Sequence, residues 1–237
     1  MSGFKKLSRK ARSPPGQKLM PRSGWGVGYY PGGRLRTVRE FGDAYASVHF
    51  DEISHMASSN PDARVLLGQL WASPSKELLD HAEKLAPFTG RDAVGKEWLF
   101  VFDGMAGNNR TTGEPFIPDP VKQMCSERVF AAILQNLRGG PADPGKVRDA
   151  IKAALAGIAV AFEYDHLNLA LTDGTAVYLA RYVDKEAEWN EIWYSKLPRA
   201  IVGCSEALQN MEHKWEKLEN RKLLVFDPGQ NLQKMDL

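Results

Sequence analysis

The stretch Gly24-Trp25-Gly26-Val27-Gly28-Tyr29-Tyr30 is a strand-like segment with regularly spaced glycines, and it decides how the chain folds. Pro31-Gly32-Gly33 follows it as a turn-prone segment, and residues 34–40 are strand-like again. The sequence therefore predicts a β-hairpin over residues 24–40. The glycines do not make a dinucleotide-binding fingerprint, because no strand precedes them and no helix follows.

Downstream of the hairpin, the pattern predicts a helix near residues 43–58 and two short buried strands. The first strand runs from about residue 63 to Trp71, and the second covers residues 98–102. We expect Asp103-Gly104 to close the second strand. After residue 162 the chain turns to strands again, with the hairpin dipeptide Asp173-Gly174 between two of them.

Two helices are expected between these groups of strands. Asp119-Pro120 supplies a capping residue and a proline at the first helical position, and Gly139-Gly140 stops the helix that follows. Asp143-Pro144 repeats the start signal, and apolar residues at helical spacing follow it. Strands, two helices and further strands together predict an α+β protein with sheets covered by helices.

The composition is that of an ordinary globular protein. The chain has 237 residues, of which 43% are hydrophobic and 25% charged. We expect no membrane span and no secretory signal, because no apolar run is long enough for the first and none follows the basic N-terminus for the second. Cys125 and Cys204 give no disulfide framework, which favours a cytoplasmic location. The five histidines occur singly, so we expect no metal and no other cofactor.

The charge is unevenly distributed along the chain. Residues 1–22 hold seven basic side chains and no acidic one, whereas the rest of the chain holds 24 basic and 29 acidic residues. We predict a flexible basic arm over residues 1–22 and one domain over residues 23–237. The arm could also make a weak contact with nucleic acid or an anionic surface, or be an organelle transit peptide.

The opening stretch resembles the "DGWGIGYY" signature of class II glutamine amidotransferases. Six further segments resemble motifs of that family in the same order: residues 67–73 (HxRxAS/T), 86–88 (NxHPF), 98–104 with Asn108 (WxFxHNG), 124–130 (TDSExLF), 167–174 (NxxLTDG) and 202–208 (VASEPL). Each motif is weak alone, but their order over some two hundred residues is specific. The resemblance implies a four-layer α-β-β-α sandwich of the N-terminal-nucleophile hydrolase type, close to the small stand-alone amidotransferases.

The resemblance also implies a mechanism. An N-terminal cysteine, with its own α-amine as the base, attacks the amide of glutamine. The asparagine side chain and the glycine N–H of "HNG" form the oxyanion hole, and an arginine binds the glutamine carboxylate. By family position, the pocket of this chain consists of Leu70, Trp71, Phe102, Asp103, Gly104 and Cys125.

This chain departs from the family at several of those positions. It begins Met1-Ser2 and has no cysteine before Cys125. Asp103 replaces the oxyanion asparagine, and Leu70 replaces the arginine. Cys125 stands at the acidic position of "TDSE", and Ala86 replaces the histidine of "HPF". Gly104 alone retains its donor.

We therefore expect a catalytically degenerate protein that binds a small-molecule ligand or acts as a partner subunit, with a partner enzyme or as a homo-oligomer. The alternative is an active amidotransferase or amidohydrolase that uses Ser2, Cys125 or an unrecorded upstream cysteine. A helix start can lower the pKa of a thiol such as that of Cys125, but its place in an apolar stripe predicts a buried, inert thiol.

Overall fold

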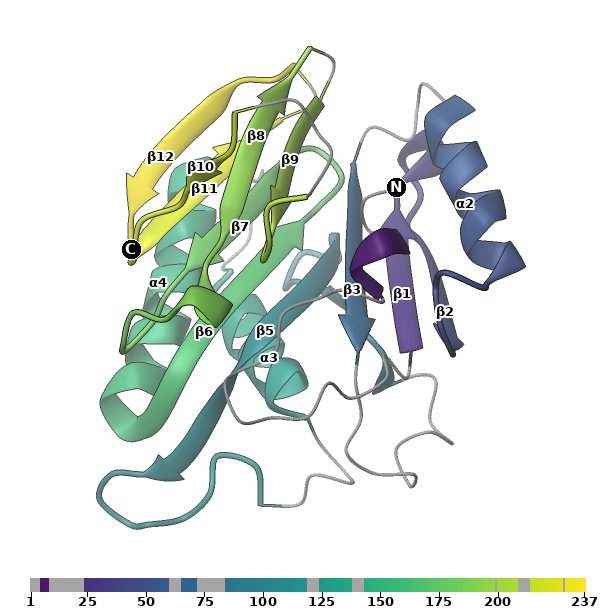
Figure 1. Cartoon of the computed structure of the whole chain (residues 1–237). Coiled ribbons are helices and arrows are strands. Elements are labelled where there is room, and N and C mark those ends of the chain that lie inside the picture. Colours follow the sequence, from purple (N-terminus) through teal and green to yellow (C-terminus); the bar gives the residue numbers. More distant parts are fainter. Residues whose placement is uncertain are drawn as a thin grey trace.

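The computed structural model describes residues 5–8, 24–59, 65–71, 84–118, 124–137, 143–198, 200–208, 214–227 and 229–237 (Figure 1). Within these residues the strands form three antiparallel sheets, and helices lie on the two outer sides. The predicted α+β class and the α-β-β-α layering are confirmed.

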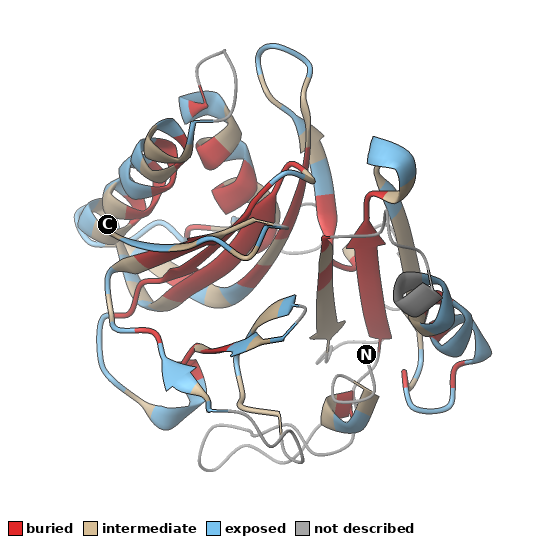
Figure 2. Cartoon of the chain, turned by 90° about the horizontal axis from the view of Figure 1, so that it is seen from above, coloured by how far each residue is buried: buried red, intermediate tan, exposed pale blue. Residues whose placement is uncertain are grey.

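The first sheet contains the predicted hairpin. Strands β1 (Gly24–Tyr29) and β2 (Arg36–Phe41) are antiparallel, and the short helix η1 (Pro31–Gly33) turns the chain between them. Strand β3 (Leu66–Trp71) pairs with the other edge of β1, so the order is β2-β1-β3. Helix α2 (Val48–Ser59) covers the outer face of this sheet (Figures 1 and 2).

Strand β1 presents different residues to its two sides because its side chains alternate. Trp25, Val27 and Tyr29 are buried in a cluster that includes Phe50 and Ile53 of α2. The glycines occupy the opposite face, which we call the glycine face, and it lies against the rest of the protein. A side chain there would collide, since a Cβ at Gly26 would lie 2.0 Å from the Ala86 carbonyl oxygen and one at Gly28 would lie 2.5 Å from Leu99.

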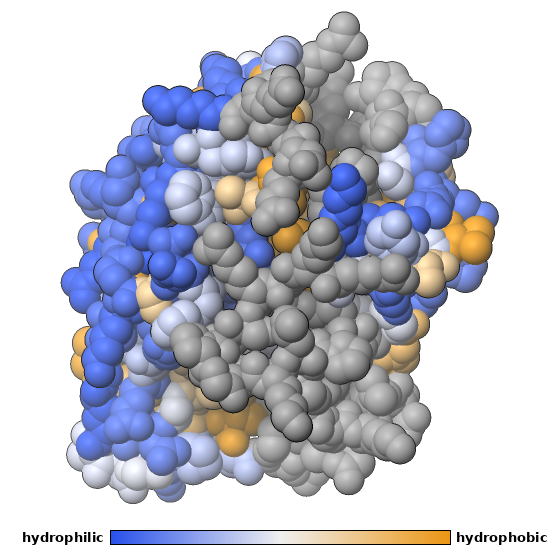
Figure 3. Space-filling view, in the orientation of Figure 1, coloured by the Kyte–Doolittle hydropathy of each residue, from blue (hydrophilic) through white to orange (hydrophobic). Residues whose placement is uncertain are grey.

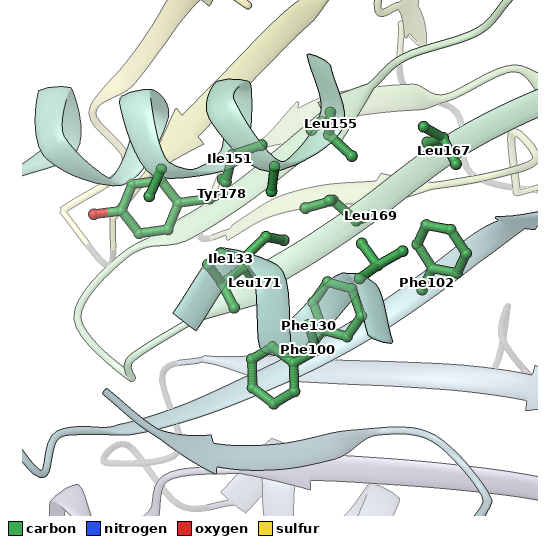
Figure 4. Close-up of a cluster of buried hydrophobic side chains, with 14 of the residues drawn as sticks. Phe100, Phe102, Phe130, Ile133, Ile151, Leu155, Leu167, Leu169, Leu171 and Tyr178 are labelled. Carbon is green, nitrogen blue, oxygen red and sulfur yellow. The ribbon is translucent and has the colours of Figure 1, made fainter. Parts of the chain in front are cut away.

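The second sheet has six strands in the order β12-β11-β7-β6-β5-β4. Their bounds are β4 (Phe88–Arg91), β5 (Glu97–Asn109), β6 (Phe162–Thr172), β7 (Val177–Arg181), β11 (Lys222–Phe226) and β12 (Leu232–Asp236). Helices α3 (Cys125–Asn136) and α4 (Pro144–Ala161) cover its outer face. The core between them contains Phe100, Phe130 and Leu155, and the rings of Phe100 and Phe130 stack with centroids 4.8 Å apart (Figure 4).

The third sheet has the order β10-β8-β9, from β8 (Trp193–Leu197), β9 (Ala200–Cys204) and β10 (Glu216–Lys217). It lies over the inner face of the six-stranded sheet, where Tyr194 shares a buried cluster with Leu179 of β7. Leu67 of β3 and Leu99 of β5 belong to the same cluster. The inner face of the large sheet is therefore covered by both smaller sheets.

The turn signals of the sequence hold in most places. The Asp143 side chain accepts a hydrogen bond from the Gly145 N–H at 2.9 Å and caps α4 as predicted. The hairpin at Asp173-Gly174 joins β6 to β7, and Gly174 has a φ of 85°. Asp119-Pro120 lies outside the described residues, and α3 begins at Cys125 with Met124 as its cap.

The prediction that Asp103-Gly104 closes a strand is wrong, because β5 continues through both residues to Asn109. Asp103 pairs with Asn168 and Gly104 with Leu167, so β6 supplies a partner that the local sequence could not reveal. Long-range pairing overrides the turn tendency of the Asp-Gly dipeptide here.

Residues 5–8 are the part of the predicted arm that the structure describes, and they form one helical turn. Lys5 pairs with Asp51 of α2 at 2.6 Å, and the Ser8 hydroxyl donates to Asp43 at 2.8 Å. The boundary at residue 22 stays a prediction. Among the described residues, no helix combines the length and apolar character needed to cross a membrane.

The surface of the described residues is largely hydrophilic on the flank of the C-terminal strands (Figure 3). The exposed large hydrophobic side chains are spread over several elements, with two of them on α2: Tyr45, Val48, Met56, Val94, Met105, Val160 and Trp189. Exposed apolar residues of this scattered kind are normal on a globular protein.

The glycine face provides a stability test. We expect Gly26→Ala to lower the free energy of unfolding by about 3 kcal/mol or more, because the new methyl group meets the Ala86 backbone. Gly157→Ala is the matched control, since a Cβ there meets nothing within 4 Å in the middle of α4. This control should raise stability by about 0.5–1 kcal/mol. Urea unfolding of both variants measures these changes. Equal changes in the free energy of unfolding for the two variants would contradict the packing role of Gly26.

Candidate functional site

Asp103 lies on the inner face of the six-stranded sheet. Along β5, Phe100 and Phe102 pack beneath the helices, whereas Leu99 packs between the sheets. Alternation therefore turns Asp103 to the same side as Leu99. The facing residue of β6 is Asn168, which is buried and whose side chain donates to the Asn190 carbonyl at 2.9 Å.

His166 lies between two carboxylates. Its Nε2 atom is 3.5 Å from Asp103 Oδ1, and its Nδ1 atom is 3.3 Å from Asp165 Oδ2. The imidazole side chain is 15% exposed, and the carboxylates are 56% and 57% exposed. Burial opposes the charged imidazolium, but hydrogen bonding and charge from Asp103, and then from Asp165, outweigh it and raise the pKa of His166.

Gly104 has a packing role of its own. A Cβ at this position would lie 2.3 Å from the His166 carbonyl oxygen, because β5 and β6 approach closely here. Glycine is therefore required for strand packing, whatever its N–H does. The fold thus requires glycine here independently of the oxyanion role that the motif resemblance predicts.

Gln69 joins the first sheet to the second. Its Nε2 donates to the Phe102 carbonyl at 2.6 Å, and its Oε1 accepts from the Phe102 N–H at 3.3 Å. The sequence reasoning missed this residue. The alternation of β3 could have revealed it, because Gln69 pairs with Gly26 and so shares the glycine face.

Leu70 and Trp71 lie on opposite faces of β3. Leu70 pairs with Trp25 and packs against the cluster beneath α2, so the structure does not bring it together with Asp103 and Gly104. Trp71 pairs with Gly24 on the glycine face, and its ring centroid is 6.3 Å from that of Phe41. Gln69, and not Leu70, is therefore the residue of β3 whose side chain contacts β5 beside Asp103.

Cys125 is the first residue of α3 and packs against the core on the helix side of the sheet. Asp103 points to the inner face, so β5 separates the two side chains. Burial raises the pKa of the Cys125 thiol, although a hydrogen bond with the Ala106 backbone and the charge of Arg128 oppose the shift. A raised pKa reduces the thiolate that could act as a nucleophile at neutral pH.

The other candidate positions have simple placements. Ser2 lies outside the described residues. Ala86 is buried, and its carbonyl faces Gly26. Phe102 contributes its ring to the helix-side core and its backbone to Gln69. The described residues contain no group of three or more His, Cys, Asp or Glu side chains that could hold a metal ion.

Two arginines on the inner faces of the sheets donate hydrogen bonds within the protein. Arg39 of β2 pairs with Gly26 of β1, and its Nε donates to the Pro87 carbonyl at 3.0 Å. Arg181 is 1% exposed, and its guanidinium donates to Glu186 at 2.6 Å and to the Asn190 carbonyl at 3.2 Å. Arg181 is therefore neutralised by a carboxylate of the protein, whereas Arg39 contacts a neutral backbone carbonyl.

The contact between His166 and Asp103 can be tested by titration. We expect Asp103→Asn to lower the pKa of His166, because the neutral amide no longer favours the imidazolium. A raised folded-state pKa stabilises the fold below the ordinary histidine value of about 6.5, and this contribution is lost as the pH rises through the raised value. The stability difference between wild type and Asp103→Asn should accordingly shrink towards alkaline pH.

NMR of the imidazole signals measures the pKa, and urea unfolding across the pH range measures the stability. Asp149→Asn, in an exposed carboxylate paired with Arg148, is the control and should leave the His166 signals unchanged. An unchanged His166 pKa in Asp103→Asn would contradict the pairing.

Comparison with known proteins agrees with the fold. The chain is similar in fold to a glutamine phosphoribosylpyrophosphate amidotransferase from B. subtilis, with a TM-score of 0.64 and 14% identity over 99% of this chain and 45% of that chain. It is also similar to a class II glutamine aminotransferase domain protein from Silicibacter pomeroyi, with a TM-score of 0.55 and 18% identity over 90% of this chain and 91% of the other. A protein described as a predicted glutamine amidotransferase from Pseudomonas aeruginosa gives 0.55 and 15% over 92% and 90%.

At such identities these likenesses show the fold, and the chain spans less than half the length of the B. subtilis enzyme. No curated protein matches the chain. The family model described as class II glutamine amidotransferases, however, matches residues 11–194, which is well over half of the sequence. The chain therefore belongs to the class II glutamine amidotransferase family.

Proposed function

We propose that this domain no longer cleaves glutamine and acts instead as a binding domain for a small-molecule ligand or a partner protein. The proposal rests on Asp103, which replaces the family's asparagine by the motif resemblance, faces the inner side of β5 and contacts His166.

The oxyanion that develops during amide cleavage requires hydrogen-bond donors. An asparagine amide donates a hydrogen bond to the negative oxygen that develops during amide cleavage, whereas an ionised Asp103 can only accept. Its charge also repels that oxygen. Losing one such donor costs about 3–4 kcal/mol of transition-state stabilisation, a hundredfold or more in rate.

Free glutamine would also have to be recognised by its carboxylate. A glutamine carboxylate is bound best by the planar fork of an arginine. The glycine-face residues of β3 are Leu67, Gln69 and Trp71, and none is cationic. Arg181 is already paired with Glu186. Strand β3 thus offers no counter-ion for the carboxylate of free glutamine.

Amide cleavage would also need a nucleophile, and Cys125 is the candidate within the described residues. Cys125 lies on the helix side of β5 with a raised pKa, which supports an inert thiol there. An active enzyme would have to use Ser2 or an upstream cysteine, together with an oxyanion hole that lacks its asparagine. A binding domain without catalytic activity requires neither a nucleophile nor an oxyanion hole.

A binding domain of this kind would work together with a partner protein. In the B. subtilis amidotransferase, the matched region is 45% of a longer chain. We propose that the present domain likewise works beside a second protein, a partner enzyme or another copy of itself, in the cytoplasm. The basic residues of the predicted arm offer, in addition, a weak contact with nucleic acid.

A glutaminase assay tests the proposal. With protein whose N-terminus is verified by intact mass, we expect no ammonia release from L-glutamine above the buffer rate. Asp103→Asn restores one donor but neither the nucleophile nor the carboxylate partner, so it should stay inactive. Ammonia release by the wild type, abolished by a thiol-directed or N-terminal block, would overturn the proposal in favour of the active alternative.

A further inference from the structure

Strand β12 is an edge strand of the six-stranded sheet. It pairs with β11 on one side, and within the described part of the chain no strand pairs with its other side (Figure 1). The Leu237 N–H donates to the Arg221 carbonyl at 3.0 Å, so the odd-numbered residues of β12 turn their main-chain groups towards β11. The N–H and C=O groups of Leu232, Lys234 and Asp236 therefore point away from the sheet, where another strand can pair with them.

The side chains of β12 divide between the two faces of the sheet. Leu232 packs against the cluster on the inner face, whereas Met235 and Leu237 pack on the helix side. Because side chains alternate along a strand, Lys234 and Asp236 lie on the inner face with Leu232. The two charged side chains are accessible there, since that of Lys234 is 35% exposed and that of Asp236 is 81% exposed.

Each of the two charges has one partner within the chain. Lys234 lies 3.6 Å from the Glu219 carboxylate, and Asp236 pairs with Lys222, its neighbour on β11. Exposed ion pairs of this kind are weak, because both groups remain in contact with water. Both charges can therefore take a second partner from another molecule.

These features make the edge complementary to itself in one register. Two copies of β12 can pair antiparallel about a two-fold axis when outward-pointing residues lie opposite one another. A register centred on Lys234 would oppose the two lysines, and one centred on Gln233 would oppose Lys234 to Leu232. A register centred on Met235 instead places Lys234 of each copy opposite Asp236 of the other.

We propose that β12 pairs with β12 of a second copy of this chain, in the antiparallel register centred on Met235. This inference rests on the proposed function, in that it names another copy of the chain as the partner. Lys234 exchanges main-chain hydrogen bonds with Asp236 of the other copy, and their side chains form an ion pair on the inner face. On the helix side Met235 meets its own counterpart, which covers apolar surface that the single chain buries only in part.

A lysine usually protects an edge strand from such pairing. Here Asp236 follows Lys234 by two residues on the same face, so the lysine of one copy meets a carboxylate of the other. Lys222 extends this row, because charges of alternating sign then run from Lys222 through Asp236 to Lys234 of the second copy. The contact is short and largely polar, so we expect a reversible dimer with a Kd on the order of 10–100 µM.

Sedimentation velocity of the full chain, from about 1 to 300 µM, tests the proposal. The wild type should pass from monomer to dimer over this range. Lys234→Asp and Asp236→Lys each place like charges opposite one another, so each should weaken self-association about tenfold or more. Glu52→Lys reverses an exposed charge on α2 in the same way and is the matched control, which should associate as the wild type does.

An equimolar mixture of the Lys234→Asp and Asp236→Lys chains tests the register itself. In the mixture the acidic residues of one chain lie opposite the lysines of the other at both positions. A heterodimer should therefore form about as tightly as the wild-type dimer, although neither variant associates with itself. A general loss of folding in the variants could not produce this recovery.

Three results would overturn the proposal. A wild type that stays monomeric over the whole range would leave the edge to a different protein. A dimer that both variants leave unchanged would use another surface, and a mixture that stays monomeric would exclude the Met235-centred register. Ammonia release from L-glutamine would overturn the proposed function without altering sedimentation, so the two failures are distinguishable.

Discussion

The structure depends on one row of residues that runs across the first sheet. Arg39, Gly26 and Gln69 are paired on three neighbouring strands and face the six-stranded sheet together. Gly26 lets the Ala86 backbone come into contact, Arg39 donates to the Pro87 carbonyl, and Gln69 meets both backbone groups of Phe102. The two sheets therefore meet through backbone contacts at this row, which side chains larger than glycine at its centre would push apart.

The same packing constraint explains why the Gly24–Tyr30 stretch matches the family motif although other residues, such as Asp103, depart from the family. The alternating glycines allow the contact between sheets, and the aromatic residues between them pack beneath α2. At the end of the stretch, the Tyr30 hydroxyl donates to the Thr172 carbonyl at 3.1 Å, and Gly174 leaves room for the Tyr30 ring. Gly104 is required by the His166 carbonyl. Packing is sufficient to explain these positions, so they identify the fold without indicating activity.

Much of the fold could be predicted from local signals, and much less of the site. The hairpin of β1 and β2, helix α4 with its Asp143 cap and the turn at Asp173-Gly174 follow from short-range patterns. The extension of β5 and the edge strand β12 depend on pairing with distant strands, which a local pattern does not contain. Asp103 was predicted from its family position. Gln69 was not, because its role depends on which face of β3 turns to β5.

We propose that the fold is retained in this chain while the recognition of glutamine is lost. Asp103 can accept but not donate when it is ionised, Leu70 packs beneath α2, and Arg181 is paired with Glu186. Calorimetric titration of the verified full chain with L-glutamine tests this claim most directly, since it does not depend on turnover. The account predicts no saturable heat of binding up to millimolar glutamine. Saturable binding with a Kd of about 1 mM or tighter would contradict it.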